Sequence, residues 1–307
     1  MLALFLSRLW QGAFVVVGVL LLTFCLLRLA PGGPFDGERQ VPEHIRRAQV
    51  AAYGLDRSLP EQALRYVWQF LSFDFPPSPR LPGRSVGEVI AASAPVSALI
   101  GVAGLGIALA IGLPLGVAAA LAAQRALDRW VMALSALLLC TPTLVLGPLL
   151  GQWFGLKLRW LNALGWEDPL DWVLPALTLG LIHSASIARL SRAGLREVLS
   201  QDFIRTARAK GLGERAVVWR HAMRLAILPT LNVLGPSAAA LLTGSMVVET
   251  VFSVPGLGQH FVGAAINRNY ELAMATAGFY AVLIVLFNLG VDGLCAWLDP
   301  RIGRRQP

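Results

Sequence analysis

Long stretches without a charged residue divide this chain of 307 residues. Only 14% of the residues are charged, against about 25% in an average soluble domain, and the charges cluster between the apolar stretches. A run of about 18 or more apolar residues can cross a bilayer as a helix. The sequence therefore predicts a polytopic all-α membrane protein, a bundle of about six transmembrane helices. The runs cover residues 9–27, 89–124, 130–156, 172–188, 225–248 and 272–291.

Basic residues are unevenly distributed among the segments that connect these runs. If the N-terminus is cytoplasmic, the inner segments carry fifteen basic and five acidic residues, and the outer segments carry eleven of each. Membrane proteins carry an excess of Lys and Arg on the cytoplasmic side. We therefore expect a multi-pass protein with both termini in the cytoplasm. This topology in the lipid bilayer explains the net charge of +8, and no nucleic-acid partner is expected.

The first apolar run is expected to form an N-terminal transmembrane helix within residues 1–30, followed by an outer loop over residues 31–90. Within this loop, Ser58 and Glu61 have the spacing of a capping box at a helix N-terminus. Apolar residues then recur at the spacing of one helix face: Leu64, Val67, Trp68 and Leu71. The pattern predicts a short amphipathic helix that lies on the membrane surface.

Two runs carry signals for special packing. Gly112 and Gly116 have small-xxx-small spacing, which lets two helices approach closely, either in a static contact or in a sliding one. Thr141 and Pro142 interrupt the third run and predict a kink. The three cysteines lie far apart in apolar segments, so no metal site or disulfide is expected and they are interpreted as small core residues.

The inner segment over residues 200–228 is rich in basic residues. Gly211 follows a short helical stretch, at the position where a helix ends in the left-handed conformation. A second basic helix, from about 214 to 228, is expected to lead to the fifth span. The result would be a helix–glycine–helix elbow on the cytoplasmic surface. From the residues alone it could bind anionic lipid or dock a cytoplasmic partner.

The sequence of this elbow resembles a known family. Residues 203–212 read Phe-Ile-Arg-Thr-Ala-Arg-Ala-Lys-Gly-Leu, and Arg-His-Ala follows at 220–222. This resembles the coupling motif of ABC-importer permeases of the peptide class, within which it is similar to the B subunits of oligopeptide permeases. Ala207 and Gly211 match the general motif, while its later part is not matched at the usual spacing. The resemblance implies these ATPase-coupling residues: Arg205, Thr206, Ala207, Arg208, Ala209, Lys210, Gly211 and His221.

Stretches elsewhere in the chain resemble the same family, including 28–35, 53–56, 244–250, 255–259 and 299–301. The resemblance implies a type I importer permease fold in a bacterial inner membrane. It implies a permease core of five transmembrane helices over 91–298, with its coupling segment at 200–228, and a cytoplasmic tail over 299–307. The implied partners are a second, homologous permease subunit in a heterodimer, two cytoplasmic ATPases that use ATP and Mg²⁺, and a periplasmic binding protein.

Residues after the fifth run suggest a gate or a scoop loop at the outer surface. A Pro-Gly turn follows that run, and Glu249 lies at its outer end, where it could face the translocation path or shape the loop. The candidate residues are Glu249, Pro255, Gly256 and Gly258. Asp292, at the inner end of the sixth run, is expected to be solvated at the interface.

The implied function is the membrane subunit of an ATP-driven importer for oligopeptides. Dipeptides, glutathione, nickel chelates and peptide antibiotics are alternative substrates. The chain itself is not expected to be an enzyme or to bind a cofactor, because neither of its lysines lies in a phosphate-binding loop. A stand-alone secondary transporter would show inverted repeats or paired broken helices, and an intramembrane protease would need a serine motif; neither pattern is found.

Overall fold

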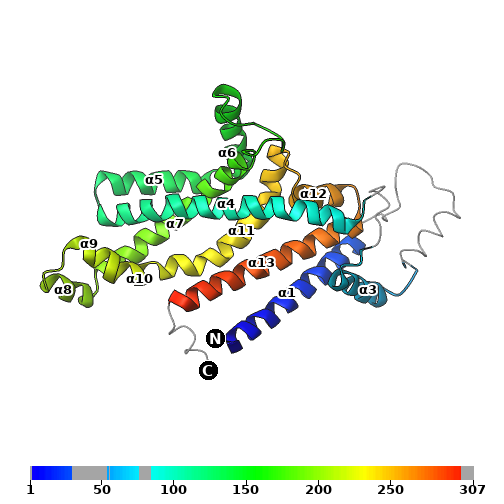
Figure 1. Cartoon of the computed structure of the whole chain (residues 1–307), viewed down its shortest axis with the longest axis horizontal. Helices are drawn as coiled ribbons and strands as arrows, with labels where there is room; N and C mark the ends of the chain where they lie inside the picture. The colour runs from blue at the N-terminus through cyan, green and yellow to red at the C-terminus, as the bar shows by residue number, and fades with distance from the viewer. Residues whose placement is uncertain (1, 30–53, 55, 76–83, 299–307) are drawn as a thin grey trace.

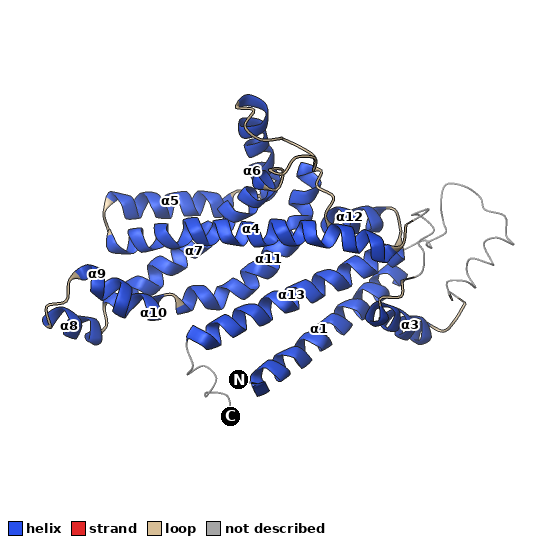
Figure 2. Cartoon of the chain, viewed as in Figure 1, coloured by secondary structure: helices blue, strands red, loops and turns tan. Residues whose placement is uncertain are grey.

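A computed structural model describes residues 2–29, 54, 56–75 and 84–298. Every regular element in these residues is a helix, so the predicted all-α architecture is confirmed (Figures 1 and 2). In chain order they are α1 (Leu2–Leu29), α3 (Leu59–Ser72), α4 (Val86–Leu121), α5 (Ala126–Cys140), α6 (Thr143–Leu150), η1 (Gly151–Lys157), α7 (Val173–Leu199), α8 (Asp202–Ala209), α9 (Glu214–Ala216), η2 (Val217–Ala222), α10 (Met223–Ala226), α11 (Leu228–Phe252), α12 (Leu257–Ile266) and α13 (Tyr270–Leu298). The elements η1 and η2 are π-helices. The predicted tail and most of the outer loop lie outside the described residues.

The predicted membrane spans correspond to long helices. Within the described residues, α1, α4, α7 and α13 are each long and apolar enough to cross a membrane. The third predicted run forms α5, α6 and η1, which pass the same test only together and as a broken span. The remaining run forms α11, a helix of 25 residues whose side chains are described in part.

The third run is bent far more sharply than a simple proline kink. The helices on either side of the break meet at 106°. Thr141 is extended, as expected for a residue that precedes a proline, and Pro142 begins α6 as its N-cap. The Thr141 hydroxyl donates to the carbonyl of Leu137 at 2.8 Å, which satisfies a group at the end of α5. The kink predicted at Pro142 is therefore confirmed, as a sharp break in the third run, and Figure 1 shows α6 projecting away from the bundle.

Helices α4 and α7 pack closely through glycine, as the small-xxx-small spacing predicts. A methyl group on Gly112 would lie 2.6 Å from the carbonyl oxygen of Ser184, and one on Gly116 would lie 2.5 Å from that of Ala188. No side chain can be placed at such distances from a neighbouring backbone. The two helices can approach this closely only because both positions on α4 are glycine.

The N-terminal helix packs on the last one. Arg8 on α1 pairs with Asp292 on α13 at 3.2 Å, and both side chains are about half exposed, which fits the interfacial place expected for Asp292. Cys25 and Cys140 are exposed on the outside of the chain. Their interpretation as core residues is wrong, because an apolar helix of a membrane protein also carries apolar residues on sides that do not pack within the chain.

The connecting segments gather at two ends of the molecule. Figure 1 shows α8, α9 and the turn between α4 and α5 at one end, and α3 and α12 at the other. The start of α1 and the end of α13 point toward the first of these ends. The basic segments expected inside thus lie together, away from the segments expected outside.

Candidate coupling segment and outer loop

The coupling segment is attached to the bundle by one face of α8. Ile204 is fully buried and Ala207 nearly so, in a cluster with Leu195 and Val198 of α7 and Val217 of η2. The remaining predicted coupling residues of α8 and its C-terminus are exposed: Arg205, Thr206, Arg208, Ala209 and Lys210. The apolar side of the amphipathic helix α8 therefore packs on the bundle, and its basic side is exposed.

Gly211 forms the bend of the elbow, in the left-handed conformation predicted for it. Its φ is +78°, and its N–H donates to the carbonyl of Arg208 at 2.9 Å. A Cβ at this position would meet nothing within 4 Å. The need for glycine is therefore conformational and not steric, because other residues pay a strain penalty in this region.

An ion pair closes the elbow. Arg208 donates from Nε and Nη2 to the two carboxylate oxygens of Glu214, at 2.7 and 3.1 Å. These hydrogen bonds from Arg208 hold the pKa of Glu214 below its usual range. Arg205 makes a second, exposed pair with Asp202 at 3.2 Å. The Arg208–Glu214 fork joins the two sides of Gly211.

The basic helix expected after Gly211 is formed without a break over residues 214–226, but its middle is a π-helix and not an α-helix. Its residues are divided among the single turn α9, the π-helix η2 and the short α10. His221, the last predicted coupling residue, lies on η2 and is half-buried. A π-helical stretch is rare and is often found at functional sites, and periodicity in the sequence cannot distinguish it from an α-helix.

At the opposite end, Glu249 is fully buried near the end of α11. Its carboxylate accepts hydrogen bonds from Ser97 Oγ at 2.7 Å and from the backbone N–H groups of Gly258 and Gln259 at 2.7 and 3.3 Å. Ser97 Oγ itself accepts the N–H of Leu257 at 2.8 Å. Two side chains from α4 and α11 thus satisfy the first three N–H groups of α12, which a helix leaves without internal partners.

The glycines between α11 and α12 and in the first turn of α12 make room for this carboxylate. A Cβ on Gly256 would overlap Glu249 Oε2, and one on Gly258 would lie 2.8 Å from the same oxygen and overlap Met246 Cα. Pro255 precedes them and is exposed. The structure brings Glu249, Gly256 and Gly258 together, and it favours the loop-shaping interpretation of Glu249.

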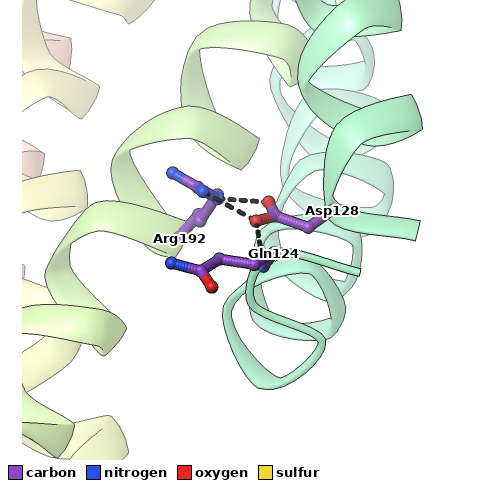
Figure 3. Close-up of polar contacts among 3 residues, drawn as sticks. All are labelled: Gln124, Asp128 and Arg192. Carbon is purple, nitrogen blue, oxygen red and sulfur yellow. Dashed lines mark hydrogen bonds and ion pairs between the residues drawn. The ribbon is translucent and has the colours of Figure 1, made fainter. Parts of the chain in front are cut away.

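Asp128 and Arg192 form an ion pair that was not predicted from the sequence. Arg192 Nε and Nη2 on α7 donate to the two carboxylate oxygens of Asp128 on α5, at 2.5 and 2.8 Å (Figure 3). The carboxylate also accepts the backbone N–H of Gln124, in the turn between α4 and α5, at 3.0 Å. No signal in the sequence joins these residues, because 64 positions separate the pair.

Sequence comparisons identify similar proteins over nearly the whole chain. The model of a family described as "binding-protein-dependent transport system inner membrane component" matches residues 112–304. The chain is 40% identical, over 304 residues, to the oligopeptide transport system permease protein OppB of Salmonella typhimurium; the match covers 98% of this chain and 99% of that protein. It is 39% identical, over 296 residues, to the dipeptide transport system permease protein DppB of Bacillus subtilis, with 96% of each covered.

The fold also has solved counterparts. A structure described as an inward-facing conformation of the MetNI methionine ABC transporter matches with a TM-score of 0.58 and 20% identity, and the match covers 69% of this chain and 96% of that one. A second crystal form of the same transporter gives a TM-score of 0.56. Similarity at this identity shows the fold alone. It confirms the predicted type I importer permease fold.

Proposed function

Because this chain belongs to the family of binding-protein-dependent transport system inner membrane components, we propose that it is one permease subunit of an ATP-driven importer for oligopeptides. It forms half of the translocation path, and a second, homologous permease subunit forms the other half. A periplasmic binding protein delivers the substrate to the outer end, and two cytoplasmic ATPases that use ATP and Mg²⁺ bind at the inner end. Both termini lie in the cytoplasm.

The elbow around Gly211 is the observation that supports the coupling role most directly. Its apolar face is anchored on α7, while its basic face is exposed. A segment that only attracted anionic lipid would need positive charge but no fixed shape. The left-handed glycine and the Arg208–Glu214 fork give this surface a fixed shape, as docking to another protein requires.

The elbow is well placed to transmit movement along the bundle. Helix α7 leads into α8 across Ser200 and Gln201, and α10 leads into α11 at Ile227. A displacement of the elbow by an ATPase therefore acts on α7 and α11 together. Helix α7 packs against α4, and α11 ends at the Glu249 network that holds α12. We expect the same displacement to change the outer end of the path.

Peptide substrates are favoured by the relatives and by the lack of a fixed charge pattern in the spans. Relatives named for oligopeptide and for dipeptide transport have nearly equal identity to this chain, so dipeptides are the second candidate substrate. A path for peptides of varied side chains cannot offer a fixed counter-charge without a desolvation cost for the substrates that lack its partner. The path should accept peptides that differ in charge.

Transport by the assembled complex tests this proposal. The chain, with its partner subunits and binding protein, would be reconstituted in vesicles and supplied with labelled peptides of two to six residues. We expect ATP-dependent accumulation of peptides of either charge. Accumulation that is driven by an ion gradient without ATP would indicate a secondary transporter. Uptake of a metal chelate alone, with no peptide transport, would overturn the peptide assignment.

A further inference from the structure

Helix α3 presents three chemically different sides. One side packs on the protein through Gln62, Tyr66 and Phe70, which are buried. The ring of Phe70 makes an edge-on contact with Phe279 of α13, with centroids 6.0 Å apart. This side places α3 firmly against the bundle, so the orientation of its other sides is fixed.

The opposite side is apolar and exposed. Leu64, Trp68 and Leu71 recur at i, i+4 and i+7 and are 73%, 71% and 59% exposed. Between this side and the buried one, along one flank, lie polar residues: Glu61, Arg65, Gln69 and Ser72. The other flank carries Ala63 and Val67, which pack partly against the core. A helix with one protein-facing side, one apolar side and one polar flank fits a boundary between water and hydrocarbon.

The position of α3 along the bundle matches such a boundary. Arg28 is the first charged residue after the apolar run of α1, and its guanidinium donates a hydrogen bond to the side-chain oxygen of Gln62. The α3 helix therefore lies at the level where α1 leaves the hydrocarbon. Leu22 and Leu26 of α1, which precede Arg28, are also exposed and apolar. The apolar surface of α1 therefore ends close to the level of the apolar side of α3 along the bundle.

We propose that the face formed by Leu64, Trp68 and Leu71 inserts into the outer surface of the bilayer, between headgroups and acyl chains, and anchors α3 as an interfacial helix. Tryptophan is enriched at this depth, because its ring is apolar and its N–H can still reach polar groups. A water-soluble protein partner would explain the apolar face but not its level at the end of a span. The inference depends on α1 spanning the membrane and not on the transported substrate.

Site-specific fluorescence quenching tests the proposal in the full complex in lipid nanodiscs. The three native cysteines are first replaced, and single cysteines carrying bimane are placed at Leu64, Trp68 and Leu71. The matched controls on the same helix are Glu61 and Ser72. We expect a nitroxide attached high on the acyl chain to quench the three apolar positions, and aqueous iodide to quench the two controls.

Each other outcome would overturn the proposal. Quenching of the three apolar positions by iodide, as strong as at Ser72, would mean that this face is in water. Protection from both quenchers would mean that a protein covers it. A measurement without substitutions guards against misfolded variants: a phospholipid with a photoactivatable acyl chain should label residues 64–71 of the unmodified protein. Labelling of α1 with none in this stretch would contradict the insertion.

Discussion

Glu249 is a carboxylate buried without a cationic partner in the described part of the chain. Its charge is balanced instead by two N–H groups at the start of α12 and by the hydroxyl of Ser97. The N-terminus of a helix carries partial positive charge, so it suits a carboxylate. Leaving these N–H groups unpaired would cost about 1–3 kcal/mol for each buried group. The residue therefore fixes α12 relative to α4 and α11.

Gly258 should be essential for this arrangement. In Gly258→Ala, the new methyl group meets the backbone of Met246, which no side-chain rotation can relieve, so α12 must move away from Glu249. We expect a clear fall in the melting temperature of the purified complex. Gly263→Ala is the matched control, because it lies on the same helix and its methyl group meets nothing within 4 Å. Equal melting temperatures for the two variants would contradict the role of Gly258.

The backbone conformation and the hydrogen-bond partners of some residues could be predicted from the sequence, and those of others could not. The left-handed conformation of Gly211 was predictable, because a glycine after a short helix is a local signal. The capping box expected at Ser58 was predicted only in part: Ser58 is the N-cap of α3 but its side chain makes no cap hydrogen bond, whereas Ser85 and Glu88 form one at α4. The partner of Glu249 could not be predicted, because Ser97 lies 152 positions away.

At the scale of elements, α7 links the coupling segment to the rest of the bundle. It packs along α4 through glycine contacts, and its Arg192 holds the turn between α4 and α5 through Asp128. The side chain of Asp128 is 4% exposed and that of Arg192 is 23% exposed. A shielded, bidentate pair of this kind is strongly directional, so it ties the inner ends of three helices together.

A double-mutant cycle tests this tie. Asp128→Asn and Arg192→Gln each leave one partner charged and unpaired, so each should lower the melting temperature of the complex. The double variant should be no less stable than the worse single variant, because the interaction can be lost only once. Arg189→Gln, on the same helix and exposed, is the control and should have little effect. If the decreases in melting temperature of the two single variants added up in the double variant, the interaction between Asp128 and Arg192 would be contradicted.

The elements that were predicted correctly are those with a strong periodic or compositional signal. Apolar runs gave the long helices, and the glycine spacing gave the contact between α4 and α7. The sharp break at Pro142 was underestimated, because a proline signals a kink but not its angle. The π-helix η2 was missed, because the same residues at the same spacing could form a regular α-helix.

At the scale of the whole molecule, the two ends of the bundle have different charge. The end with α8 and the turn between α4 and α5 contains the basic segments, and the end with α3 and α12 does not share this excess. The positive-inside rule supports the proposed orientation, in which the basic end is cytoplasmic. In this orientation the elbow would lie where ATP is available, and the end of the bundle with α3 and α12 would face the proposed binding protein.

Labelling of intact cells tests the orientation. Single cysteines at Ser72 and Gln201, both exposed in the structure, would be offered to a membrane-impermeant thiol reagent in a background without native cysteines. Replacing the native residues is required, because Cys25 and Cys140 are themselves exposed. We expect labelling at Ser72 in cells with a permeabilised outer membrane, and at Gln201 only after lysis. The reverse pattern would refute the orientation.

Two neighbouring glycines of the elbow, Gly211 and Gly213, separate the coupling role from other effects of a substitution in this segment. Gly211 has a φ of +78°, whereas Gly213 has a φ of −64°, and a Cβ at either position would meet no neighbour within 4 Å. Valine at Gly211 is strained by roughly 1–2 kcal/mol in the left-handed conformation, while valine at Gly213 is free of this strain. The two substitutions add the same atoms to the same surface.

The measurement is peptide uptake per ATP hydrolysed by the assembled complex, at matched membrane levels of each variant. We expect Gly211→Val to lose ATPase attachment or to hydrolyse ATP without transport, and Gly213→Val to stay close to the unmodified protein. Uptake, ATPase retention and hydrolysis at normal levels in both variants would contradict the coupling role of the elbow.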